Sequence, residues 1–201
     1  MTRPLPDTWS LSVVAPVYNE RDTLEPFVNE LVDVLDALAP PGGYEIVLVD
    51  DGSTDGSAEA LDGCALAHSG IVQVVHLARN FGMEPAISAG LDQTRGGAVI
   101  VLDSDMQDDP HAFADFVAKW QEGYDVVYAV RTARTEGPLR RALFWSFYRL
   151  LGRLANIELP PDASNFALMD RAVVDTLRAM PERNRFLRGL RAWVGFAQTG
   201  E

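Results

Sequence analysis

Short apolar runs rich in β-branched residues alternate with segments of helical spacing along the first 130 residues of the chain. The apolar runs predict buried strands, at residues 11–18, 44–50, 71–78, 98–104 and 124–130. Apolar residues spaced three and four apart predict helices between these strands, at residues 22–38, 54–67, 83–94 and 110–121. Regular alternation of strand and helix predicts a Rossmann-like α/β fold, with a mostly parallel central sheet and helices on both faces.

The pattern changes after residue 131. Residues 137–157 have the spacing of one long amphipathic helix, residues 165–170 predict a short strand, and residues 171–180 and 183–194 predict further helices. The sequence contains no internal repeat and no linker rich in Pro, Gly or Ser. With 201 residues, we expect a single domain spanning residues 1–201.

Charge is distributed unevenly along the chain. The 17 basic and 29 acidic residues give a net charge of −12, which argues against a nucleic-acid binder. Residues 1–130 contain 22 acidic and 5 basic residues, whereas residues 131–201 contain 7 acidic and 12 basic residues. Every cation of this last part is arginine, which suits contacts with phosphate and with a membrane surface. Solvated helix faces are the alternative interpretation.

Several classes of protein lack support in the sequence. There is no GxGxxG dinucleotide motif, no GxxxxGK phosphate loop and no GxSxG elbow, and the three histidines lack the spacing of zinc ligands. No stretch reaches the roughly 18 apolar residues of a spanning helix, so we expect any membrane contact of this chain to be peripheral. The single cysteine, Cys64, and an N-terminus without the apolar core of a signal peptide indicate a reducing, cytoplasmic setting.

Acidic motifs follow three of the predicted strands: PVYNE at 16–20, VDDGSTD at 49–55 and LDSDMQDDP at 102–110. In an open α/β sheet, ligands bind beyond the carboxyl ends of the strands, which is where these motifs lie. Three acidic clusters at one edge would repel one another unless a cation or the hydrogen-bond donors of a ligand lay among them. Each motif taken alone could instead be a solvated turn or a helix cap.

The third motif offers ligands for a divalent cation. Asp103, Asp105 and Gln107 alternate, so in extended backbone they would project to one side and present three oxygen ligands to Mg²⁺ or Mn²⁺. An EF-hand is excluded, because Asp108 stands in place of the turn glycine and Ala114 in place of the bidentate glutamate.

Taken together and in order, these motifs resemble the family 2 glycosyltransferases with the GT-A nucleotide-diphospho-sugar transferase fold. More narrowly, they are similar to the polyprenyl-phosphate sugar transferases of the dolichol-phosphate-mannose-synthase-like group. The resemblance extends over nearly the whole chain, through RNFG (79–82), an arginine after the fifth strand, DxxxFxLMDR (162–171) and PERNRFLRGLRAW (181–193).

The resemblance implies roles for individual residues. Those expected to bind the nucleotide-sugar are Pro16, Tyr18, Glu20, Val49, Asp51, Asp103, Ser104, Asp105, Gln107 and Arg131. Within this set, Val49 and Asp51 fall at the base edge, where a carboxylate can accept from a ring N–H. The metal ligands are expected to be Asp103, Asp105 and Gln107. Catalysis is assigned to Asp103, Asp105 and Arg131, and the acceptor phosphate to Arg140, Arg185 and Arg188.

The implied reaction is inverting transfer of a hexose from a UDP- or GDP-linked donor to an undecaprenyl or dolichyl phosphate, at the cytoplasmic face of a membrane. An acceptor phosphate is already anionic, so no general base is required. Residues 1–130 would form the nucleotide-sugar part and residues 131–201 the acceptor side, with the chain continuing beyond Glu201; a homo-oligomer is compatible with this assignment. The alternatives are a transferase with a soluble or polysaccharide acceptor and a non-catalytic nucleotide-sugar-binding module.

Overall fold

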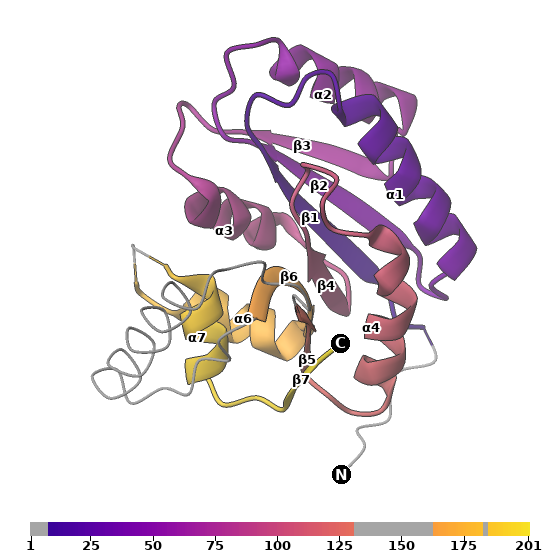
Figure 1. Ribbon diagram of the computed structural model, residues 1–201, viewed down its shortest axis with the longest axis vertical. Helices are drawn as coiled ribbons and strands as arrows, with labels where there is room; N and C mark the ends of the chain where they lie inside the picture. The colour runs from indigo at the N-terminus through magenta and orange to yellow at the C-terminus, as the bar shows by residue number, and fades with distance from the viewer. Residues whose placement is uncertain (1–7, 131–162, 183–184) are drawn as a thin grey trace, which may run out of the picture.

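The computed structural model describes residues 8–130, 163–182 and 185–201 (Figure 1). The predicted helix at 137–157 lies outside the described residues, as do Arg131 and Arg140. Within the described ranges, no helix has the length and apolar character needed to cross a membrane.

A seven-stranded sheet forms the centre of the fold, in the order β3-β2-β1-β4-β6-β5-β7. Its strands are β1 (Leu11–Val17), β2 (Tyr44–Asp50), β3 (Val72–His76), β4 (Ala98–Val101), β5 (Val126–Val130), β6 (Ala163–Asp170) and β7 (Gln198–Gly200). Strands β1 to β4 pair in parallel, and β7 pairs in parallel with β5. Strand β6 is antiparallel to both β4 and β5. The predicted α/β class and mostly parallel sheet are therefore confirmed.

Helices cover both faces of the sheet, as predicted (Figure 1). One face carries α1 (Leu24–Leu38), α2 (Ser57–Ala67) and α4 (Phe113–Gln121), the last preceded by the short 3₁₀ helix η1 (Pro110–Ala112). The other face carries α3 (Met83–Gln93), α6 (Arg171–Ala179) and α7 (Leu187–Trp193). Alternate residues of β1 supply the two cores: Val13 packs toward α1 and Val14 toward α3. This explains why the inner strands are apolar on both faces over most of their length.

The element bounds differ from the prediction at three places that bear on function. Strand β4 ends at Val101, three residues before the predicted end. Helix α2 begins at Ser57 rather than at 54, because residues 52–56 form a turn that bonds to the segment after β1. Strand β7 was not predicted, since its three residues carry no apolar alternation.

The parallel register brings the carboxyl ends of the inner strands to one edge. Val17 lies opposite Asp50, and Asp50 lies opposite His76. The segments that follow β1, β2, β3 and β4 consequently meet, although Leu102, the first residue after β4, lies 85 residues after Val17 in the sequence.

Candidate active site

A cavity of about 300 Å³ opens at this edge of the sheet. Its described walls come from the end of β1 and from the segments after β1, β2, β3 and β4. They are Pro16, Val17, Tyr18, Glu20, Asp51, Asn80, Gly82, Met83, Asp103, Ser104 and Asp105. Seven of the residues predicted to bind a nucleotide-sugar thus line one cavity, and they come from three separate acidic motifs.

Asp51 supports the floor of the cavity. Its side chain is buried, with 3% of the residue exposed, and its Oδ1 and Oδ2 accept the backbone N–H groups of Phe81 and Gly82 at 2.7 and 2.9 Å. Next to it, Gly52 has φ +68°, and a Cβ there would clash with the backbone of Arg79. The sequence VDDG therefore lets β2 end directly against the RNFG segment and hold that segment by a carboxylate.

The segment after β1 interlocks with the turn after β2. Asn19 has a left-handed backbone (φ 55°); its N–H donates to Ser53 Oγ at 3.1 Å, and its Oδ1 accepts the N–H of Thr54 at 2.8 Å. The N–H of Glu20 donates to Ser57 Oγ at 2.9 Å. These bonds fix the backbone on both sides of Asn19, so the positions of Tyr18 and Glu20 in the cavity wall depend on the DGSTD turn.

The segment after β4 forms a turn, so the prediction that Asp103, Asp105 and Gln107 project from extended backbone is wrong. Met106 has φ 59°, and Asp105 Oδ1 accepts the N–H of Gln107 at 3.0 Å. This turn is anchored to β1, because Ser104 Oγ donates to the carbonyl oxygen of Pro16 at 2.9 Å. Asp103 and Asp105 line the cavity, whereas Gln107 is not among its lining residues.

The carboxylates of this turn are suited to a divalent cation. Within the described ranges, no three His, Cys, Asp or Glu side chains gather into a group able to hold a metal ion. Mg²⁺, however, is usually bound through one or two carboxylates together with waters and substrate phosphates, and Mn²⁺ accepts the same oxygen ligands. Asp103 and Asp105 provide such a pair at the cavity, so the donor set fits a cation shared with a phosphate-bearing ligand.

Val49 is placed away from the cavity surface. It is fully buried in the core beneath α3, where a Cβ on Gly90 would lie 3.0 Å from Val49 Cγ2. Its side chain thus supports the sheet one residue before the Asp50–Asp51 pair and forms none of the cavity lining.

Strand β6 and helix α7 meet the cavity at the start of α3. Asn165 Nδ2 lies 3.1 Å from the sulfur of Met83, a cavity residue, and Glu84 Oε2 accepts the N–H of Leu187 at 3.0 Å. Burial raises the pKa of Glu84. The contacts place the first turn of α7 beside the cavity.

The predicted phosphate-binding arginines of this region do not line the cavity. Arg185 donates to the carbonyl oxygens of Met180 and Glu182, both at 3.1 Å, and thereby holds the end of α6. The Arg188 guanidinium lies 5.3 Å from the centre of the Phe186 ring. Arg191, which was not predicted as a site residue, is buried; burial lowers its pKa to about 10, and it donates to the carbonyl oxygen of Ser164.

Four lining residues had no predicted role: Val17, Asn80, Gly82 and Met83. Three of them lie in or just after the RNFG motif, which follows the third predicted strand. Their position after a parallel strand was the available signal, because that rule applies to neutral residues as well as to acidic ones.

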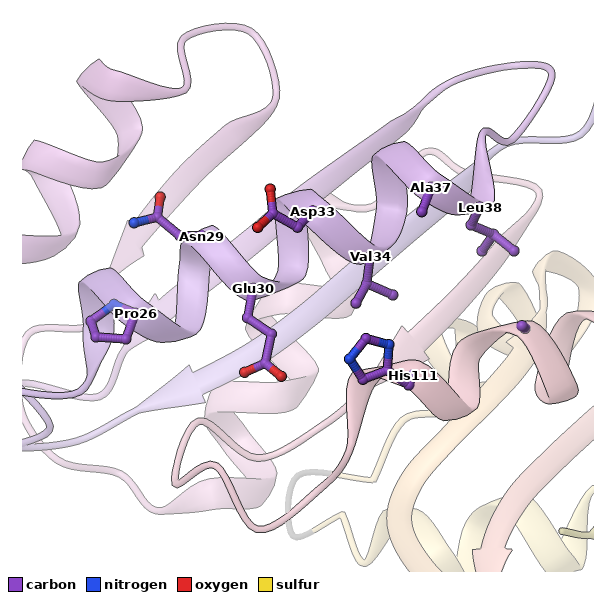
Figure 2. A pocket seen from close by; sticks show the side chains of 9 residues that line it. Pro26, Asn29, Glu30, Asp33, Val34, Ala37, Leu38 and His111 are labelled. Carbon is purple, nitrogen blue, oxygen red and sulfur yellow. The ribbon is translucent and has the colours of Figure 1, made fainter.

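A second cavity, of about 560 Å³, lies between α1 and the start of α4. Figure 2 shows Val34 of α1 directed toward His111, with Glu30 and Asp33 along the same helix. It contains none of the predicted site residues, so the cavity at the strand ends is the candidate active site.

Known structures define the class of fold. The mannosyltransferase PcManGT of Pyrobaculum calidifontis, solved with GDP-Man and Mn²⁺, superposes with a TM-score of 0.64 at 22% identity, over 95% of this chain and 54% of that one. Glucosyl-3-phosphoglycerate synthase of Mycobacterium tuberculosis gives a TM-score of 0.56 at 22% identity, over 82% and 58%. The fold is that of the GT-A glycosyltransferases.

Sequence comparison identifies the family. The profile of glycosyl transferase family 2 matches residues 12–178, and the chain belongs to this family. The uncharacterized glycosyltransferase sll0501 of Synechocystis sp. is 45% identical over 96% of this chain. A bactoprenol glucosyl transferase of Shigella phage SfX is 38% identical over 92%. The chain spans 60% of the length of each of these two relatives.

Proposed function

We propose that this chain is the catalytic part of an inverting glycosyltransferase that moves a hexose from a UDP- or GDP-linked donor to a polyprenyl phosphate. The observation that carries the proposal is the cavity to which the ends of β1, β2 and β4 contribute Tyr18, Asp51 and Asp105. A lipid acceptor is supported by the relative named bactoprenol glucosyl transferase, which is 38% identical to this chain.

The donor would lie in the cavity with its diphosphate toward the turn after β4. Asp103 and Asp105 would hold Mg²⁺ or Mn²⁺, with Gln107 as a further proposed ligand. The ion, when bound, would neutralise charge that develops on the departing nucleoside diphosphate. Pro16, Tyr18, Glu20 and Ser104 would contact the nucleotide-sugar, and Asp51 the edge of the base. We assign Arg131, outside the described residues, to the same diphosphate.

The acceptor would approach from the side of α7. Its phosphate is anionic at neutral pH and needs orientation rather than deprotonation before it attacks the sugar. We assign that orientation to Arg188 and Arg185, together with Arg140 outside the described residues. A lipid acceptor implies action at the cytoplasmic face of a membrane, with residues 1–130 handling the donor and the remainder handling the acceptor.

Nucleotide binding tests the donor site. In isothermal titration, we expect UDP or GDP to bind more tightly with Mn²⁺ than with EDTA. In the presence of Mn²⁺, Asp105→Asn should weaken nucleotide affinity by about tenfold or more, because a charge-assisted contact contributes about 1.5–3 kcal/mol. Asp115→Asn, on the exposed side of α4, is the matched control. Equal binding with Mn²⁺ and with EDTA would refute a metal-assisted donor site.

Acceptor choice is tested separately. Labelled UDP- and GDP-hexoses are offered with undecaprenyl phosphate in vesicles or with soluble sugars and polysaccharides. Label in the lipid fraction that is released by mild acid, as expected for a glycosyl phosphate, supports the proposal. Transfer to the soluble acceptors alone would establish the alternative transferase.

A further inference from the structure

His76, at the carboxyl end of β3, lies between two carboxylates outside the cavity. Its Nδ1 is 3.1 Å from Asp50 Oδ2, and its Nε2 is 3.1 Å from Asp62 Oδ1. The parallel register places His76 opposite Asp50, whereas Asp62 belongs to α2. An imidazole can donate to both carboxylates at once only when both ring nitrogens carry protons. The arrangement therefore favours the imidazolium form and ties α2 to the sheet.

The carboxylate of Asp50 continues this connection toward the cavity. Asp50 is buried, and its second oxygen, Oδ1, accepts the N–H of Ser53 at 2.9 Å. The hydroxyl oxygen of Ser53 in turn accepts the N–H of Asn19 at 3.1 Å. Asn19 stands between Tyr18 and Glu20, which both line the cavity. Three consecutive hydrogen bonds thus join His76 to the cavity wall.

We propose that His76 is a positioning residue for the donor site: by fixing the Asp50 carboxylate, it sets the turn after β2 and, through Ser53 and Asn19, the wall that presents Tyr18 and Glu20. The inference rests on the proposed function, because it assigns His76 to the nucleotide cavity. Removing His76 leaves only Ser53, of the residues that the structure describes, to hold the Asp50 carboxylate, so Ser53 and Asn19 are less firmly fixed and the nucleotide must order the wall when it binds.

The same geometry makes the donor site sensitive to pH. The charged groups that face the ring among the described residues are Asp50 on β2 and Asp62 on α2. Hydrogen bonding to Asp50 raises the pKa of His76 above its ordinary 6.5; burial opposes this effect and Asp62 adds to it. Because the pKa of His76 is raised, both hydrogen bonds of its ring are present below pH 6.5. One of the two is lost as the pH rises through the pKa of His76 in the folded chain. The neutral ring keeps one N–H, for which Asp50 and Asp62 then compete, so donor affinity should decline in part over that upper range.

The experiment measures the dissociation constants of UDP and GDP with Mn²⁺ between about pH 6 and pH 9. His76→Leu is expected to weaken binding about five- to tenfold at the low end of this pH range, which corresponds to one ordinary hydrogen bond because the effect reaches the cavity only through Asp50 and Ser53. His76→Gln keeps one N–H donor for Asp50 and should recover most of the affinity without the pH dependence. His68→Leu is the matched control, because His68 is a half-buried histidine directly after α2 whose ring contacts Asn29.

A second variant keeps the test decisive if His76→Leu does not fold. Asp62→Asn leaves the bond to Asp50 intact and removes the outer carboxylate, so the pH at which affinity declines should move downward. An unchanged midpoint in Asp62→Asn, or a folded His76→Leu that binds as tightly as His68→Leu, would overturn the inference while the wild-type chain still binds nucleotide. A wild-type chain that binds neither nucleotide would overturn the proposed function and this inference with it.

Discussion

Replacing Asp51 with alanine tests whether this carboxylate holds the floor of the cavity. The substitution removes both acceptors of the Phe81 and Gly82 N–H groups, which are bound at 2.7 and 2.9 Å by a side chain that is buried. Hydrogen bonds to charged groups contribute about 1.5–3 kcal/mol each. Water can reach the freed N–H groups through the cavity and offset part of the loss. We therefore expect a decrease of about 2–4 kcal/mol in the free energy of unfolding.

Urea denaturation measures this change directly, and thermal unfolding should show a midpoint lower by roughly 5–15 °C for a chain of this size. The variant should remain folded, because domains are typically stable by about 5–15 kcal/mol. Asp51→Asn keeps one acceptor oxygen and should fall between the wild-type chain and Asp51→Ala. Affinity for UDP or GDP should fall together with stability, because the segment that Asp51 holds lines the cavity.

Asp92→Ala is the control for loss of a surface carboxylate. Asp92 pairs with Arg178 at 3.4 Å, and its side chain is 54% exposed, so we expect a change below about 1 kcal/mol. If Asp51→Ala unfolds at the same urea concentration as Asp92→Ala, the two hydrogen bonds do not stabilise the cavity floor. Loss of nucleotide affinity without loss of stability would instead show that Asp51 acts on the base alone.

Two further predictions concern the sheet. In Gly90→Ala, the new methyl group would clash with Val14 on β1, so we expect the free energy of unfolding, measured by urea denaturation, to fall by about 1–3 kcal/mol. Unchanged stability would contradict the close packing of α3 against β1. Burial alone would raise the pKa of Glu45, but hydrogen bonds from Ser12 and Arg95 lower it below its ordinary 4.5. The stability advantage of the wild-type chain over Glu45→Gln should be present above pH 4.5 and be lost as the pH falls through the lowered value; an advantage that persists in stronger acid would refute this linkage.

The sequence alone was sufficient for the features that depend on local pattern. Apolar runs and helical spacing predicted the inner strands and the helices that follow them, because burial on two faces or on one stripe leaves a period in the sequence. The acidic motifs after three strands predicted where a site would lie, since parallel strands end at a common edge. Seven predicted residues accordingly line one cavity.

Tertiary structure decided the features that depend on partners distant in the sequence. Strand β6 enters antiparallel between β4 and β5, with Ala98 opposite Asp170, and no period in its eight residues specifies direction or neighbours. The turn after β4 was predicted as extended because alternation was the only local signal, while its geometry depends on the anchor from Ser104 to Pro16, 88 residues away.

Asp51 illustrates the same division within a single residue. Its place after a strand marked it as a site residue, but the role of its carboxylate depends on N–H groups 30 and 31 residues further along the chain. His76 gave no signal at all, because its significance comes from lying between Asp50 on the neighbouring strand and Asp62 on a helix. Hydrogen bonds act over about 3 Å in space, whatever the separation in sequence, so the roles that they assign become visible only when the chain is folded.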